Sequence, residues 1–105
     1  MSAQSPTVPT PNVPTLEPVW LIEATYVANA TEVRAPFRPA HLARLTELKE
    51  RGAVIEAGAY ADASASLLMV RVANEDEALE LCKADIYWQN GVWVDLSARA
   101  FARLP

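Results

Sequence analysis

His41 is the only histidine in this 105-residue sequence, and it follows a predicted helix start. Pro39 marks that start, because the first N–H groups of a helix have no intrahelical partner. At about 100° per residue, one face of the predicted helix carries Phe37, His41, Leu45 and Leu48. Residues expected at or beyond the edges of that face, towards water, are Arg44, Glu47 and Glu50. An ionisable ring on the core-facing side of a helix needs a polar partner.

Asp85 is the candidate partner. A second helix is predicted over residues 74–84, with its core-facing stripe formed by Ala78, Leu81 and Cys82. One more turn along this stripe reaches Asp85, next to the apolar cluster Ile86-Tyr87-Trp88. A carboxylate at the C-terminal end of a helix is disfavoured by the helix dipole and by loss of hydration. We therefore expect compensation, and His41 is the other ionisable residue predicted to face the core.

A His41–Asp85 pair suits general acid–base chemistry. A carboxylate bonded to one imidazole nitrogen fixes the tautomer and leaves the other nitrogen free to move a proton. Proton abstraction next to a carbonyl, isomerisation and elimination are reactions of this kind. Arg34 and Arg38 could hold an anionic group near the helix start, and Tyr87, like Tyr26 and Tyr60, could supply a hydroxyl. We expect no covalent nucleophile, because Cys82 is predicted to be packed and Ser64 and Ser66 are not expected near His41.

The elements that must position these residues follow the order strand, helix, strand, strand, helix, strand. Their predicted ranges are 19–28, 37–51, 53–60, 66–73, 74–84 and 92–97, with a loop at 29–36 and a tail at 98–105. Gly52 is predicted to cap the first helix, Gly58 to mark a bulge or a close backbone approach, and Asn74 with Glu77 to cap the second helix. The third strand is apolar on both faces and is therefore expected at the centre of the sheet. This order predicts an α+β fold, the ferredoxin-like split βαβ sandwich, with both helices on one face of a four-stranded antiparallel sheet.

The other face of that sheet is expected to need a partner. It would expose either Leu21 and Val27 or Leu67 and Met69, which is too apolar a surface to leave in water. We therefore predict a homodimer, and dimers that pair further remain open. The tryptophans, expected as core or dimer-interface anchors, are Trp20, Trp88 and Trp93. Residues 1–18 contain five of the eight prolines and are predicted to form a separate extended arm, not an inner strand.

Composition limits the partners. The net charge is −4, and the sequence has no basic run, which argues against nucleic-acid binding. A single cysteine, Cys82, and a single histidine make a disulfide or a transition-metal site within one chain unexpected. Neither a membrane span nor a signal peptide is visible, so we predict a cytoplasmic location and no membrane partner. We expect a small-molecule ligand and no cofactor.

Several segments together resemble the YciI-like protein family. They are Arg38-Pro39-Ala40-His41-Leu42, Gly52, Ala57-Gly58, Ala84-Asp85-Ile86-Tyr87 and Gly91-Val92. The resemblance spans residues 19–101, within a domain predicted over residues 19–105, and leaves out the N-terminal arm. It implies a dimeric α+β barrel, related in architecture to muconolactone isomerase. It also implies that His41 and Asp85 form the active-site pair. The sequence departs from the family at Ile86 and Ala59, where the family commonly has proline, and in its short loop at 61–65.

Two functions remain open from the sequence. The first is a cofactor-free small-molecule enzyme of the lyase or isomerase type, with His41 as general acid/base and Asp85 as the residue that orients it. The second is a non-catalytic dimeric ligand-binding or accessory module, in which the pair only braces two helices. An open cavity that reaches a ring nitrogen of His41 favours the enzyme, whereas a sealed and fully packed His41 favours the brace.

Overall fold

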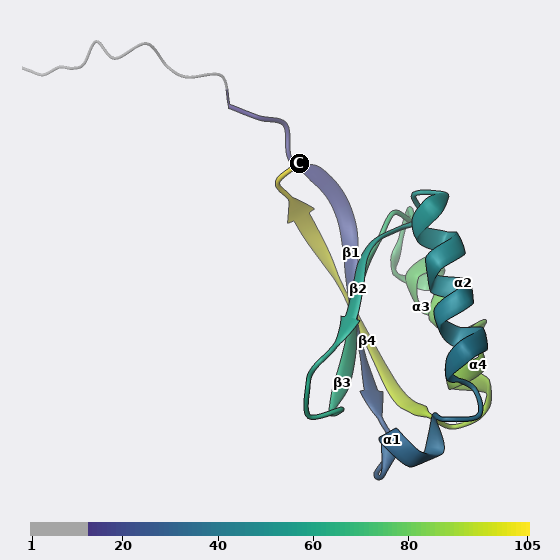
Figure 1. Ribbon diagram of the computed structural model, residues 1–105. Coiled ribbons are helices and arrows are strands. Elements are labelled where there is room, and N and C mark those ends of the chain that lie inside the picture. The colour runs from purple at the N-terminus through teal and green to yellow at the C-terminus, as the bar shows by residue number, and fades with distance from the viewer. Residues whose placement is uncertain (1–12) are drawn as a thin grey trace, which may run out of the picture.

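The computed structural model describes residues 13–105 as a four-stranded antiparallel sheet with helices packed on one face (Figure 1). The strand order is β2-β3-β1-β4, so β3 and β1 are the central strands. The elements are β1 (Glu17–Tyr26), α1 (Ala30–Val33), α2 (Arg38–Glu50), β2 (Val54–Ala59), β3 (Ala65–Val70), α3 (Glu75–Lys83), α4 (Ile86–Gln89) and β4 (Trp93–Arg103). The predicted ferredoxin-like α+β fold is confirmed, and β3 is central as its sequence indicates.

Strand pairing explains where the core lies. Ile22 of β1 is opposite Leu68 of β3 and Ala98 of β4, so these three side chains share the face that the helices cover. Because side chains alternate along a strand, residues two positions away lie on the same face. The helices add the other side of the core, which contains Leu48 of α2 with Ala78 and Cys82 of α3. His41 and Leu48 are buried, and Phe37 and Leu45 are half-buried, so the predicted inner face of α2 is confirmed.

Both long helices end or begin as their sequences predict. Gly52 follows α2 with a φ of 78°, and the N–H of Ala53 donates to the Leu48 carbonyl at 2.9 Å. This is the glycine-capped helix end in which a left-handed residue satisfies the last carbonyls. At the start of α3, the Asn74 side chain accepts from the Glu77 N–H at 2.9 Å. The Glu77 carboxylate in turn accepts from the N–H of Ala73, one residue earlier than in a standard capping box.

Several predicted strand limits are wrong. β1 and β3 end at Tyr26 and Val70, before their predicted ends at 28 and 73, and two further differences lie near the ends of the chain. β1 begins at Glu17 and includes Pro18, within the predicted arm. Pro18 is tolerated because it is paired with β4 only, and the pairing of β1 with β3 starts at Trp20. The predicted tail at 98–105 is largely strand, since β4 continues to Arg103 opposite Glu17. Its alternating alanines have little intrinsic preference for a strand, so the pairing with β1 determines that this segment is extended. The rest of the predicted arm, residues 1–12, lies outside the described residues.

The sheet irregularities are also not where the sequence suggested. The predicted bulge at Gly58 is absent, and the β2–β3 register shifts between Val54 and Glu56 instead. A second shift lets Tyr26 pair with Trp93 while Thr25 pairs with Asp95, which leaves Val94 as the extra residue. An extra residue reverses the alternation of side chains. Val94 is therefore 50% exposed and Trp93 only 1% exposed, so Val94 does not share a face with Val92 and Leu96, as simple alternation over residues 92–97 would predict.

Two short helices occupy segments for which the sequence predicts no helix, the loop at 29–36 and the apolar cluster Ile86-Tyr87-Trp88. α1 lies between β1 and α2, and its preceding residue Asn29 is left-handed with a φ of 59°. α4 follows α3 after a single break at Ala84 and Asp85. Four residues are too few for a periodic pattern to show in the sequence. No helix in the described part of the chain is long and apolar enough to cross a membrane.

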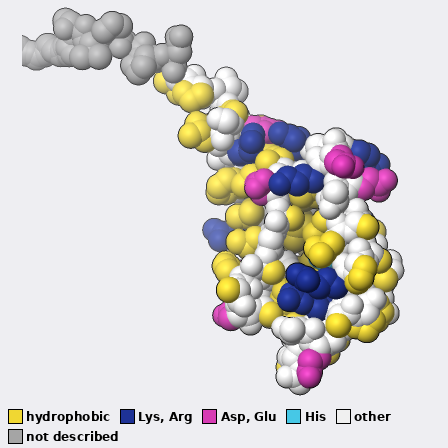
Figure 2. All heavy atoms as spheres, viewed as in Figure 1, with side chains coloured by type: hydrophobic (Ala, Val, Ile, Leu, Met, Phe, Trp, Pro, Cys, Tyr) yellow, Lys and Arg dark blue, Asp and Glu magenta, His cyan; other side chains and the backbone are white. Residues whose placement is uncertain are grey.

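The sheet face opposite the helices carries apolar side chains. Leu21, Leu67 and Met69 line a shallow groove of about 240 Å³ on it, and all three are half-buried. Phe101 of β4, which pairs with Val19, is 43% exposed. Hydrophobic side chains are visible along this outer side of the sheet (Figure 2). Among the predicted anchors, Trp93 is buried, whereas Trp20 and Trp88 are half-buried against the core.

Replacing Gly52 by alanine is expected to lower the free energy of unfolding by about 1 kcal/mol, because a side chain disfavours the left-handed conformation. Urea unfolding followed by circular dichroism would measure the loss. Arg51→Ala is the matched control, since Arg51 is exposed with a φ of −82°, which alanine adopts readily. An equal effect of both substitutions would contradict this role of Gly52.

Candidate active site

Asp85 and His41 meet at the end of α3, as the sequence predicts. His41 Nδ1 lies 2.7 Å from Asp85 Oδ1, and both side chains are buried, with His41 4% and Asp85 0% exposed. α2 carries His41 in its first turn, with Pro39 at the helix start. The two helical segments are brought together over the same face of the sheet, as Figure 1 shows.

The local setting of Asp85 differs from the sequence-based expectation. Asp85 does not terminate α3 but caps the start of α4, where its Oδ1 accepts from the Tyr87 N–H at 2.9 Å. A carboxylate at a helix N-terminus is stabilised by unpaired N–H groups, so the expected conflict with the helix dipole is absent. Ile86, where the family commonly has proline, occupies the first helical position, at which the N–H is unpaired in any residue.

Arg44 completes the ring of donors around Asp85, and the prediction that it points to water is wrong. Its Nη1 donates to Asp85 Oδ2 at 2.9 Å, and its Nη2 donates to the Leu81 carbonyl at 2.8 Å. The side chain is 26% exposed. Arg44 lies three residues after His41 on α2, and residues three apart are neighbours on a helix surface. That spacing is the signal in the sequence that could have placed Arg44 near Asp85.

These contacts set the charge of Asp85. Burial alone would raise the pKa of the Asp85 carboxyl, but hydrogen bonds from His41, the Tyr87 N–H and Arg44 outweigh it, so the pKa lies below its ordinary value of 3.8. An ionised carboxylate can only accept hydrogen bonds. The His41–Asp85 contact therefore requires the proton on Nδ1, and in the neutral ring Nε2 keeps its lone pair.

Aromatic rings fix the plane of the His41 imidazole. The Tyr87 ring stacks on it at 3.6 Å between centroids and 7° between planes, and the Trp93 ring meets it edge-on at 5.2 Å. Trp93 is itself held by its indole N–H, which donates to Ser66 Oγ at 3.3 Å. No pattern in the sequence places Trp93 or Ser66 near His41. The bulge at Val94 turns Trp93 inwards, and no single-residue pattern in the sequence marks that bulge.

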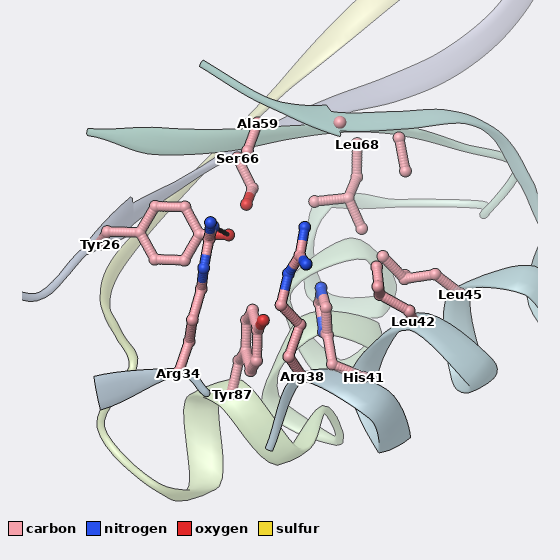
Figure 3. A pocket seen from close by; sticks show the side chains of 12 residues that line it. Tyr26, Arg34, Arg38, His41, Leu42, Leu45, Ala59, Ser66, Leu68 and Tyr87 are labelled. Carbon is pink, nitrogen blue, oxygen red and sulfur yellow. Dashed lines mark hydrogen bonds between the residues drawn. The ribbon is translucent and has the colours of Figure 1, made fainter. Parts of the chain in front are cut away.

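A cavity of about 170 Å³ lies beside His41. Its walls hold all three predicted substrate-binding residues, Arg34, Arg38 and Tyr87, together with Tyr26 and Ser66, so the expectation that Ser66 lies far from His41 is wrong. Figure 3 shows the His41 ring between Arg38 and Leu42, and the apolar walls include Leu42, Leu45 and Leu68. Asp85 occupies Nδ1, which leaves Nε2 as the ring nitrogen that can serve this cavity. In Figure 2, Lys and Arg side chains gather on the surface between the sheet and the helices.

Two further groups are excluded from ionised roles at neutral pH. Burial, and to a smaller extent Asp85, raises the pKa of the Cys82 thiol to about 12, so Cys82 is not a thiolate nucleophile. Burial and the nearby Tyr26 raise the pKa of the Tyr87 phenol, against the opposing charges of Arg34 and Arg38. Tyr87 therefore keeps its hydroxyl proton and can donate it in a hydrogen bond.

Fold and site together define the class of protein, an α+β sandwich with a His–Asp pair beside a small cavity. The YCII-related domain family matches residues 19–102, and the chain belongs to this family. The fold is similar to that of 5-chloro-2-hydroxyhydroquinone dehydrochlorinase from Burkholderia phenoliruptrix in complex with 2,5-dihydroxybenzoquinone. That structure aligns with a TM-score of 0.68 and 21% identity, over 79% of this chain and 92% of the other. A search of curated protein sequences finds no match.

Replacing Asp85 by asparagine should destabilise the protein by roughly 3 kcal/mol at pH 7, since it removes a buried charge with three donors. The folded-state pKa of Asp85 is lowered, so its contribution to stability is complete above 3.8 and is lost as pH falls through the lowered pKa. The difference in unfolding free energy between wild type and Asp85→Asn should therefore shrink in acid. Denaturant titrations between pH 7 and pH 2 measure it.

The control for that experiment is Asp95→Asn, which removes one exposed carboxylate from β4 and leaves the buried contacts intact. A difference between wild type and Asp85→Asn that stays constant across the acid range would contradict an ionised, hydrogen-bonded Asp85.

Proposed function

We propose that the protein is a cofactor-free enzyme that performs lyase- or isomerase-type general acid–base chemistry on a small molecule. The observation that carries the proposal is the cavity beside His41, whose Nδ1 is held by Asp85 at 2.7 Å. A buried pair that only braces two helices needs no open space at the free ring nitrogen. The same geometry is what a general base requires, since it must reach the proton that it removes.

In the proposed reaction, His41 Nε2 takes a proton from a carbon or hydroxyl next to a carbonyl of the substrate. The ionised Asp85 stabilises the imidazolium that forms, while Arg44 and the Tyr87 N–H hold the carboxylate in place. Negative charge that develops on the substrate oxygen is stabilised by Arg34, Arg38 and the neutral Tyr87 hydroxyl. Returning the proton to a different atom gives an isomerisation, and departure of a leaving group gives an elimination.

The similar solved structure supports this proposal. The similar structure is named a dehydrochlorinase, and loss of HCl is an elimination that a proton acceptor can assist. At 21% identity this likeness establishes the fold, so the substrate of that enzyme serves here as a starting compound for assays. The alternative is a non-catalytic ligand-binding module in which the His41–Asp85 pair is structural.

Replacing His41 by asparagine should reduce turnover by about 100- to 10,000-fold, the range that general acid–base groups contribute. Asparagine retains a side-chain N–H that can donate to Asp85, so the fold should survive. Chloride release from 5-chloro-2-hydroxyhydroquinone, and deuterium uptake next to the carbonyl of small cyclic ketones, would be followed for both proteins. Circular dichroism and thermal unfolding would be measured in parallel.

The matched control is Arg51→Ala, an exposed substitution at the far end of α2. The alternative function predicts the opposite pattern, with no turnover or exchange by the wild type and a loss of thermal stability in His41→Asn. Equal turnover by wild type and His41→Asn would exclude His41 as the catalytic base.

We also propose that the protein is a homodimer, or a larger assembly of such dimers, in which the open sheet faces pack together. The support is the apolar groove of Leu21, Leu67 and Met69, since contiguous apolar surface on a soluble domain commonly marks an interface. Sedimentation should give twice the monomer mass of 11.5 kDa, or a multiple of that dimer mass, and Met69→Lys should shift the species to monomer. Ala43→Lys, on the exposed side of α2, is the control. A monomeric wild-type protein would exclude the dimer.

A further inference from the structure

The charge of the cavity wall indicates what kind of ligand it accepts. Arg34 and Arg38 both line the cavity, and no aspartate or glutamate lines it. Within residues 13–105, neither arginine forms a salt bridge. Arg34 instead contacts the neutral Tyr26, with Nη1 3.4 Å from its hydroxyl. The nearest buried carboxylate, Asp85, is already bonded to His41 and Arg44. The cavity therefore has two positive charges that no protein carboxylate neutralises.

These charges act inside the cavity. Both arginines line the same cavity as Tyr87, and their positive charges oppose the increase in the pKa of its phenol. A partly enclosed space strengthens such a potential, since the effective dielectric constant there is lower than in bulk water. This potential favours the binding of an anionic ligand over that of an uncharged ligand of the same shape.

The opposite part of the cavity is apolar. Leu42 and Leu45 of α2 and Leu68 of β3 line it. In Figure 3, Arg34 and Tyr26 lie on one side of the view and Leu42 and Leu45 on the other, with Arg38 and His41 between them. A ligand that uses both parts has an anionic group at the arginines and an apolar body at the leucines. His41 then lies at the junction, next to the atoms adjoining the charged group.

Size restricts the apolar body. The cavity measures about 170 Å³, and an engineered apolar cavity of about 150 Å³ in another protein binds benzene. One six-membered ring with small substituents therefore fills this space.

We infer that the ligand of this site is a monocyclic organic oxyanion, either a ring carboxylate or an ionised ring hydroxyl. Its oxygen binds Arg34 and Arg38, and its ring packs on Leu42, Leu45 and Leu68. This inference rests on the proposed function, because it assigns the substrate class of the same cavity. It adds the placement of the reacting atom, which is the ring position next to the oxyanion-bearing carbon, beside His41.

Ligand affinity tests this inference without any turnover. Isothermal titration calorimetry would compare benzoate with benzamide, which has the same shape without the charge, and with acetate, which has the charge without the ring. Benzoate should bind at least about tenfold more tightly than either, since benzamide lacks the charge-assisted hydrogen bonds to the arginines and acetate lacks the ring that packs on the leucines. Benzoate affinity should fall as salt is raised. Binding of 4-nitrophenolate at or above the affinity of benzoate would assign the ring hydroxyl, and weaker binding the ring carboxylate.

Arg38→Met should weaken benzoate about tenfold and leave benzamide unchanged, and Arg34→Met should act in the same direction. Arg51→Met is the control, because it removes an exposed arginine distant in sequence from the cavity-lining start of α2. Each variant would first be checked by circular dichroism. Equal affinities for benzoate and benzamide, equal affinities for benzoate and acetate, or an unchanged benzoate affinity in both arginine variants would each overturn the inference.

His41→Asn separates this inference from the proposed function. If benzoate binds as described and His41→Asn has no effect on turnover, the ligand class holds and the proposed chemistry fails. If turnover depends on His41 but benzoate and benzamide bind equally, the chemistry holds and the oxyanion assignment fails.

Discussion

The rest of the structure depends on keeping the buried carboxylate of Asp85 ionised. Moving a carboxylate out of water costs several kcal/mol unless donors replace the lost hydration. Here the donors come from the His41 ring, the Arg44 guanidinium and the Tyr87 N–H. Two belong to α2 and one to α4, so these helices can separate only by leaving the charge unpaired. Arg44 extends the constraint to α3 through the Leu81 carbonyl. One side chain therefore fixes how three helical segments lie on the sheet.

The bonds that stabilise Asp85 are also the bonds that would prepare His41 for chemistry. An ionised carboxylate at Nδ1 determines which nitrogen carries the proton, and stacking on Tyr87 restricts rotation of the ring. No movement is then needed to present Nε2 to the cavity. Preorganisation of this kind makes a catalytic group effective, because the cost of ordering it is met during folding. Stability and the proposed function therefore use the same contacts, and neither can be altered alone at Asp85.

The sequence predicts the fold and the two central residues well because both depend on periodicity. Apolar spacing identified the inner faces of α2 and α3, and those faces carry His41 and lead to Asp85. The rest depends on local geometry that has no period. A one-residue break converts Asp85 from the end of one helix into the cap of the next, and a bulge at Val94 brings Trp93 inwards. Arg44 was misplaced because a long side chain can reach back across the helix surface, whereas spacing describes only where its Cα lies.

Small residues beneath α2 explain why the core is not closed over His41. Ala57 is opposite Leu68, and Ala59 is opposite Ser66, on the strands that face the start of α2. All of these residues line the cavity together with Gly58. Larger side chains at the two alanines would fill the space, as protein interiors normally do, and would bury His41 among apolar atoms. Leaving about 170 Å³ open forfeits packing contacts that a larger residue would supply. A chain that needed only a brace between α2 and α4 would gain stability by filling this space, so the small residues favour a site that a ligand completes.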